Sequence, residues 1–117
     1  MTAAEWERLR DAIAALPPDV RDAIRARTES APSATPLTCP MLDRERGSCL
    51  VYAARPIACR TYGFYTERDA GLHCNQVTRA VEDNASAESV VWGNGEAIAD
   101  DMKTFGEVIS LRTWMNR

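Results

Sequence analysis

Residues 39–74 read CPMLDRERGSCLVYAARPIACRTYGFYTERDAGLHC and hold all four cysteines of the 117-residue chain, which are Cys39, Cys49, Cys59 and Cys74. Nine, nine and fourteen residues separate successive cysteines. Structural thiols would be scattered among apolar helical positions, whereas these stand among glycine, proline and charged residues. That setting is poor for packing and suits ligands, so we expect this segment to decide the fold.

The chemistry expected of these cysteines is binding of one shared metal centre. The chain begins MTAAEWER, which carries acidic side chains and no apolar run, so a secretory signal is not predicted. We therefore expect a reducing compartment, the cytoplasm, where cysteines serve as ligands or thiols more often than as disulfides. Unrelated reduced thiols and disulfide pairs are the two alternatives.

The kind of metal is left open by the spacing. Four thiolates suit a tetrahedral zinc ion and a [4Fe-4S] cluster equally. Zinc ribbons usually supply their ligands as Cys-x-x-Cys pairs, and this chain has no such pair. Long, even loops can surround a bulkier centre, and Cys39-Pro40 matches the Cys-Pro ending of many cluster motifs. The pattern slightly favours the [4Fe-4S] cluster over Zn²⁺.

Charged neighbours of the cysteines are expected to adjust the site. Arg55 and Arg60 bracket Cys59. A guanidinium close to a four-thiolate site would lower the cost of burying its negative charge. The alternative is that both arginines are solvated. His73 directly precedes Cys74, and because adjacent side chains rarely point at the same ion, we expect it beside the metal or on the surface.

Composition indicates a single domain, residues 1–117, with a thin apolar core. Eighteen of the apolar residues are alanine, which contributes little on burial, and a metal is one of the few devices that stabilise so small a fold. The net charge of −3 argues against a nucleic-acid partner. No apolar run approaches the roughly 18–20 residues of a membrane span. The expected partners are a metal ion or cluster and, as a second possibility, another protein.

The predicted fold class is mainly α, with short helices and an irregular, metal-stapled, cysteine-rich region. Residues 1–28 are predicted to form a helical hairpin, because proline ends the first helix and begins the second. Thr2 and Glu5 have the spacing of a capping box, and Trp6 lies on an apolar stripe that faces the core. Residues 28–38 indicate an exposed connector.

Short elements are predicted in the rest of the chain. Within the metal-binding segment, residues 39–74, a helical turn runs from 56 to about 62 and ends at Gly63. A short helix follows to about residue 81, and Gly93-Asn94-Gly95 indicates a turn. The C-terminal helix, residues 95–106, is expected to point four apolar side chains inward, namely Ala97, Ile98, Met102 and Phe105. The apolar end of the chain is expected to dock on the core.

Catalytic residues are not predicted. The Gly93-Asn94-Gly95 stretch lacks the strand and helix of a phosphate-binding fingerprint. The paired acids are interpreted as surface charge, and one histidine leaves little material for acid–base catalysis; these acids are Asp43, Glu45, Asp100 and Asp101. An enzyme that uses an open metal position, or a site elsewhere, is the alternative class.

A family resemblance is carried by Cys39-Pro-Met-Leu, Cys49-Leu-Val-Tyr52-Ala-Ala-Arg55-Pro56-Ile-Ala-Cys59-Arg60 and Gly71-Leu-His-Cys74. These stretches, within residues 37–75, resemble the YkgJ-type cysteine-cluster family of zinc- or iron-chelating domains. That family's Cys-x-x-Cys-x-x-Cys-Cys run is absent, so the chain resembles a reduced branch with four ligands for one site. The resemblance implies no reaction and is compatible with an accessory role near an enzyme. It implies chelation by the four cysteines, with the site shaped by Tyr52, Arg55, Pro56 and Arg60.

Overall fold

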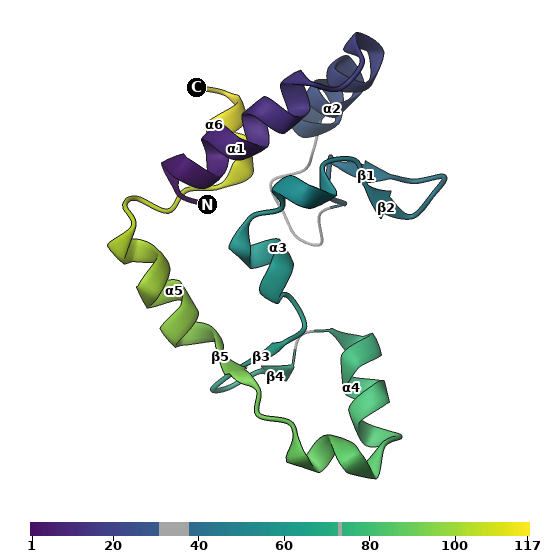
Figure 1. Ribbon diagram of the computed structural model, residues 1–117, viewed down its shortest axis with the longest axis vertical. Helices are drawn as coiled ribbons and strands as arrows, with labels where there is room; N and C mark the ends of the chain where they lie inside the picture. The colour runs from purple at the N-terminus through teal and green to yellow at the C-terminus, as the bar shows by residue number, and fades with distance from the viewer. Residues whose placement is uncertain (31–37, 73) are drawn as a thin grey trace. The chain divides into compact units, whose positions relative to one another are not determined.

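The computed structural model describes residues 1–30, 38–72 and 74–117. Their contacts divide the chain into two compact units. Unit 1 consists of Met1–Pro56 and Glu107–Arg117, and unit 2 consists of Ile57–Gly106. Short helices predominate in both units, and each unit also contains one small sheet. The predicted mainly α class is therefore confirmed (Figure 1).

Unit 1 combines helices with one β-hairpin. Strands β1 and β2 are antiparallel, with Leu42 opposite Cys49, and the loop between them passes through Gly47 at a φ of 64°. A positive φ suits glycine because it has no Cβ. The elements are α1 (Ala3–Ala14), α2 (Pro18–Ser30), β1 (Leu42–Asp43), β2 (Ser48–Cys49), the 3₁₀ turn η1 (Tyr52–Ala54) and α6 (Leu111–Met115).

The first helix begins at the predicted capping box. Thr2 Oγ1 accepts a hydrogen bond from the Glu5 amide at 3.4 Å, and Glu5 Oε2 accepts one from the Thr2 amide at 2.8 Å. These contacts satisfy two amides that have no partner within the helix. Pro18 opens α2, as expected for a residue whose missing N–H is not needed in a first turn.

The second helix is longer than predicted, which corrects the start of the connector. Thr28, Glu29 and Ser30 belong to α2. Thr28 is buried, and its hydroxyl donates to the Ile24 carbonyl at 2.9 Å, so a polar side chain continues the helix by bonding its own backbone. The remainder of the predicted connector, residues 31–37, lies outside the described residues.

The apolar core of unit 1 is built from several elements. Its buried members are Leu9, Ile24, Met41, Val51 and Ala54, and the partly buried Leu111 and Met115 of α6 pack against them.

Two tryptophans from opposite ends of the chain flank this core. Trp6 stacks on Trp114 with ring centroids 6.1 Å apart and planes 12° apart. Trp114 Nε1 also donates to the Met1 carbonyl at 3.1 Å. The predictions that Trp6 packs into the core and that the chain end docks on it are therefore confirmed.

Unit 2 is a string of short elements around a small sheet. Strand β3 lies between antiparallel β4 and parallel β5. Its elements are α3 (Ile57–Thr61), β3 (Tyr65–Glu67), β4 (Gly71–Leu72), α4 (Asn75–Glu82), the 3₁₀ turn η2 (Ala85–Ser89), β5 (Gly93–Asn94) and α5 (Gly95–Thr104).

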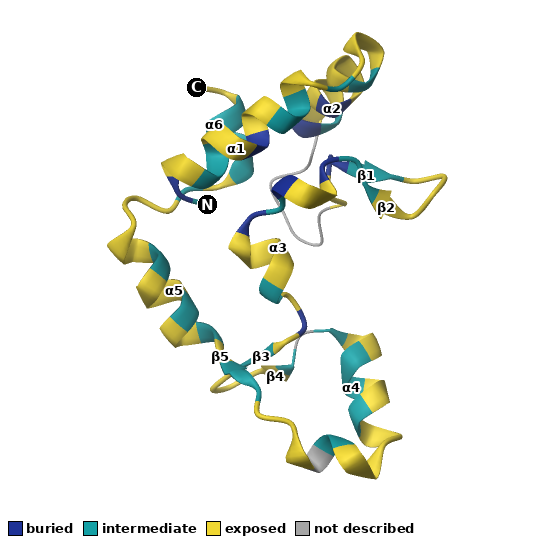
Figure 2. Cartoon of the chain, in the orientation of Figure 1, coloured by how far each residue is buried: buried dark blue, intermediate teal, exposed yellow. Residues whose placement is uncertain are grey.

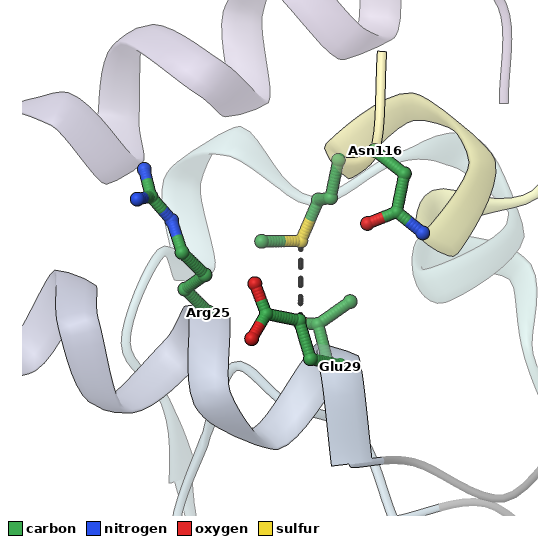
Figure 3. Close-up of a pocket in the computed structure, with 5 residues that line it drawn as sticks. Arg25, Glu29 and Asn116 are labelled. Atoms are coloured by element: carbon green, nitrogen blue, oxygen red, sulfur yellow. Dashed lines mark hydrogen bonds between the residues drawn. The ribbon is translucent and has the colours of Figure 1, made fainter.

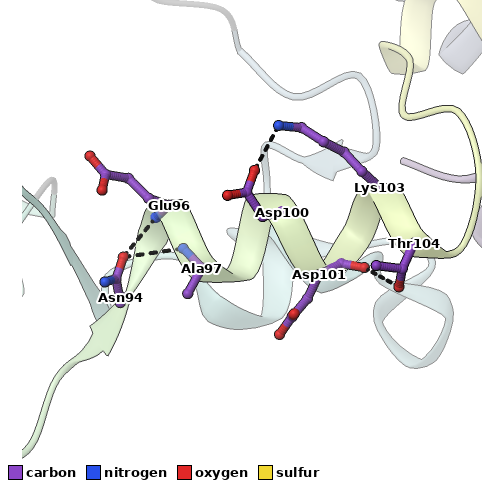
Figure 4. A network of polar contacts seen from close by, with 7 residues as sticks. All are labelled: Asn94, Glu96, Ala97, Asp100, Asp101, Lys103 and Thr104. Atoms are coloured by element: carbon purple, nitrogen blue, oxygen red, sulfur yellow. Dashed lines mark hydrogen bonds and ion pairs between the residues drawn. The ribbon is translucent and has the colours of Figure 1, made fainter.

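The stretch Gly93-Asn94-Gly95 is not the isolated turn that the sequence predicts. Gly93 and Asn94 form β5 beside Tyr65 and Thr66, and α5 begins at once. Asn94 Oδ1 caps that helix by accepting from the amides of Glu96 at 3.0 Å and Ala97 at 3.2 Å (Figure 4). The segment is thus a strand that passes directly into a helix cap.

The prediction that four apolar side chains of α5 point inward is confirmed for two of them. Ile98 and Met102, four residues apart, are half-buried on one face, whereas Ala97 is exposed. Phe105 is 74% exposed because it lies beyond the last helical residue, where the chain turns through Gly106 at a φ of 119°.

The acids of α5 behave as surface charge. Lys103 Nζ lies 2.7 Å from Asp100 Oδ1, and both side chains are largely exposed (Figure 4). Asp101 is also exposed, and its carbonyl accepts from the Thr104 hydroxyl at 2.7 Å. Asp43 differs from them in being half-buried, because its carboxylate accepts the Glu45 and Arg46 amides in the loop after β1.

Burial is distributed unevenly between the two units (Figure 2). Every buried hydrophobic side chain belongs to unit 1. Among the residues of unit 2 whose burial is described, Gly63 alone is buried. Hydrophobic burial therefore stabilises unit 1 and contributes much less to unit 2.

We predict that Leu9→Ala lowers the free energy of unfolding by about 2–5 kcal/mol, because Leu9 is only 1% exposed and its loss leaves a cavity in the core. Urea unfolding followed by circular dichroism measures this. Val91→Ala is the control, since Val91 is 95% exposed and should change stability by less than about 0.5 kcal/mol. Equal effects of the two substitutions would contradict the assignment of the core.

Candidate metal centre

Cys39 and Cys49 lie at one end of the β1–β2 hairpin. The Leu42 amide donates to the Cys39 carbonyl at 3.1 Å, which forms a tight turn through Pro40 and Met41. Leu42 is in turn the register partner of Cys49. Cys39 is exposed and Cys49 half-buried, and the buried Pro40 and Met41 anchor the turn to the core. The hairpin thus brings the first two cysteines to neighbouring positions of unit 1.

Cys59 and Cys74 both belong to unit 2. Cys59 is exposed in the one-turn helix α3. Cys74 is half-buried and occupies the N-cap of α4, although its side chain makes no capping hydrogen bond. The Thr78 amide donates to the Cys74 carbonyl at 2.9 Å and begins the helix, and the Thr78 hydroxyl donates to the same oxygen at 3.2 Å. The sulfur of Cys74 is therefore not used by the helix that it begins.

Each unit carries two of the four cysteines, Cys39 and Cys49 in unit 1 and Cys59 and Cys74 in unit 2. Within residues 1–30, 38–72 and 74–117, no set of three or more His, Cys, Asp or Glu side chains could hold a metal ion. All four cysteines are described and none forms a disulfide. His73 lies outside the described residues. The donor chemistry fits zinc or an iron–sulfur cluster, which both take thiolate sulfur, and convergence of the four sulfurs stays a prediction.

Arg55 is held against the turn that precedes α3. Its Nε donates to the Tyr52 carbonyl at 3.2 Å, and its Cζ lies 3.6 Å from the centroid of the Tyr52 ring. The planar guanidinium thus uses one edge for a hydrogen bond and one face for a cation–π contact. Pro56 is buried directly before α3, and Arg60 is exposed within it.

Two residues near the cysteines were missed by sequence reasoning. Arg8 Nη2 in α1 donates to the Ala53 carbonyl at 2.7 Å, which ties the first helix to the η1 turn. Nothing in the spacing distinguishes Arg8 from the other surface charges of that helix. Gly63 was expected only as the end of a helix, yet it also lies against Cys74. Only the tertiary structure shows that contact.

Two depressions on the described part of the chain are lined by residues other than the cysteines. One, of about 300 Å³, lies in unit 1 between α2 and α6, where the Thr28 hydroxyl is 3.3 Å from Met115 Sδ (Figure 3). It is lined by Arg25, Thr28, Glu29, Met115 and Asn116. Another, of about 230 Å³ in unit 2, is lined by Thr66, Arg68, Trp92, Gly93, Asn94 and Glu96.

In the described part of the chain, none of the helices combines the length and the apolar character needed to cross a bilayer.

Comparison with known proteins points to metal chelation. A family model described as "CxxCxxCC: Putative zinc- or iron-chelating domain" matches residues 3–88, which include all four cysteines. The match also spans the central motif from Cys49 to Arg60. No curated protein and no solved structure is significantly similar to the chain.

We predict that Arg55→Ala weakens metal binding about 10–100-fold, the usual cost of losing a residue that supports a ligand loop. Arg55→Lys should recover only part of the loss, because a lysine lacks the planar fork that bonds the Tyr52 carbonyl and covers its ring. Metal retention under mild chelator challenge measures both. The control is Arg10→Ala, which replaces an exposed arginine that pairs with its neighbour Asp11 in α1. Full retention in both Arg55 variants would show that this residue does not support the site.

Proposed function

Because the chain belongs to the CxxCxxCC family of zinc- or iron-chelating domains, we propose that it binds one metal centre through Cys39, Cys49, Cys59 and Cys74. Residues 39–74 are then the metal-binding segment of a single domain, residues 1–117. The observation that carries the proposal is that all four cysteines lie inside the family match, with none of them in a disulfide. Thiolate sulfur is the donor that both zinc and iron–sulfur clusters prefer.

Each unit offers two of the four proposed ligands. The hairpin of unit 1 supplies Cys39 and Cys49, and α3 and the start of α4 supply Cys59 and Cys74. The amides at the beginning of α4 lie next to Cys74, a position where the helix dipole favours negative charge such as that of a ligand thiolate. Tyr52, Arg55, Pro56 and Arg60 are proposed to shape the loops between the pairs.

A [4Fe-4S] cluster is the centre that we favour. The chain lacks the Cys-x-x-Cys pair of common zinc sites, and its nine- and fourteen-residue loops can surround a large centre. Zn²⁺ on the same four cysteines is the alternative. Four protein ligands leave no open position, and closed sites are structural or transfer electrons. The proposed roles are therefore those of a redox, sensor or accessory protein, or with zinc a structural adaptor. We also propose a reducing compartment, the cytoplasm, because cysteines serve there as ligands more often than as disulfides.

Anaerobic purification of the full chain tests the identity of the centre. A brown protein that contains four iron and four sulfide per chain supports the cluster. A colourless protein with one zinc per chain supports the alternative on the same ligands. A parent protein that retains neither metal would overturn the proposal.

Single substitutions test the ligand set. We predict that each of Cys39→Ser, Cys49→Ser, Cys59→Ser and Cys74→Ser loses most of the bound metal, because a four-ligand centre depends on every thiolate. Ser48→Ala is the matched control, since Ser48 is exposed and adjacent to Cys49 in β2. Metal content is measured after gel filtration. A cysteine whose replacement leaves the metal in place is not a ligand.

We also predict that removing the metal loosens unit 2 more than unit 1. Unit 2 has little buried apolar surface, so metal–thiolate bonds would supply a larger share of its stability. Hydrogen exchange is compared in the metal-loaded and chelator-treated full chain. Amides of α4 should exchange at least tenfold faster without metal, a difference of about 1.4 kcal/mol, while those of α1 change less. Unchanged α4 protection after confirmed metal loss would show that the centre does not stabilise this unit.

A further inference from the structure

Gly63 occupies an unusual place in unit 2. It lies two residues after the end of α3, where the Phe64 amide donates to the Thr61 carbonyl at 2.9 Å and closes a turn. Its φ is 85°, a conformation that L side chains rarely adopt. Among the residues of this unit whose burial is described, Gly63 is the one that is buried. Both the backbone and the surroundings therefore call for glycine.

The surroundings consist of the first turn of α4. A Cβ atom at Gly63 would lie 3.2 Å from the Cβ of Cys74 and 3.3 Å from Val77 Cγ2. It would also be 3.8 Å from the Cys74 sulfur. The Cβ of Cys74 is bonded directly to the main chain and cannot rotate away. A side chain at residue 63 would therefore displace the backbone that carries the Cys74 thiol.

We propose that Gly63 is a positioning residue for the metal centre, because its bare Cα lets the start of α4 close against the turn that follows α3. Cys59 is four residues before Gly63, so this contact holds Cys74 against the same short segment that carries Cys59. The inference rests on the proposed function and deepens it by naming what fixes the second pair of ligands.

Gly71 offers a matched control in the same unit. Its φ is 66°, close to that of Gly63, and a Cβ there would meet no atom within 4 Å. Asparagine tolerates this backbone conformation better than other residues with a side chain. Gly63→Asn and Gly71→Asn thus impose a similar backbone cost. Only the first also pushes on Cys74.

The test is a titration of the metal-free full chain with Co²⁺ under anaerobic, reducing conditions. The thiolate-to-cobalt absorption at saturation reports how many thiolates bind the ion, whereas general destabilisation weakens affinity and leaves the saturated spectrum intact. The parent and Gly71→Asn should show a four-thiolate spectrum. Gly63→Asn should show the reduced spectrum of Cys74→Ser and bind Co²⁺ about 10–100-fold more weakly than the parent.

The outcomes separate this inference from the proposed function. If the parent has a four-thiolate spectrum and Gly63→Asn matches Gly71→Asn, Gly63 does not position the ligand and the metal site stands. If the parent shows no thiolate absorption and also holds neither iron–sulfur cluster nor zinc after anaerobic purification, both are overturned.

A second pair of variants covers failure of Gly63→Asn to fold, judged by circular dichroism. Gly63→Ala introduces a smaller side chain than Gly63→Asn. The double variant, Gly63→Ala with Val77→Ala, also removes the contact with Val77 and keeps the contact with Cys74. Both should still lack the contribution of one thiolate. A four-thiolate spectrum in the double variant would overturn the role assigned to the contact with Cys74.

Discussion

Close packing around Leu9 and Ile24 is the interaction on which unit 1 depends. These are its two fully buried large side chains, and they come from α1 and α2. The turn before β1 adds Met41, the segment before α3 adds Val51, and α6 packs against them from the far end of the sequence. Burial of a large aliphatic side chain stabilises a fold by about 1.5–3 kcal/mol. The buried apolar side chains of the described chain are thus concentrated in unit 1, which also carries Cys39 and Cys49.

Unit 2 relies on close backbone approaches and helix caps in place of a core. Its strands are two or three residues long. A Cβ at Gly95 would lie 2.7 Å from Tyr65 Cδ2, so the tyrosine ring packs directly on the backbone at the start of α5. Such contacts fix geometry and bury little surface. Structural zinc contributes about 10–16 kcal/mol to the folding of small domains. Two ligand cysteines in this unit would therefore place a strong interaction where hydrophobic stabilisation is weakest.

Features set by local sequence were predicted, and features set by distant contacts were not. The capping box of α1, the proline between the first two helices and the glycine after α3 each depend on a few neighbouring residues. By contrast, β5 forms because Gly93 pairs with Tyr65, far away in the sequence. For the candidate site, spacing predicted four thiol donors. It could not show the Arg55 stack on Tyr52 or the approach of Gly63 to Cys74, because these arise from packing in three dimensions.

The discontinuity of unit 1 has a consequence for how the chain folds. The Met1 ammonium donates to the Ile109 carbonyl at 2.7 Å, and the Ile109 amide donates back to Met1, so the two segments meet only after residues 57–106 have been spanned. Bringing the ends of a flexible loop together costs entropy that grows with the logarithm of loop length. Ordering any part of unit 2 shortens the flexible portion and lowers that cost. Metal capture early in folding, if the proposed ligands bind it, would then speed the return of α6, although none of those ligands belongs to that helix.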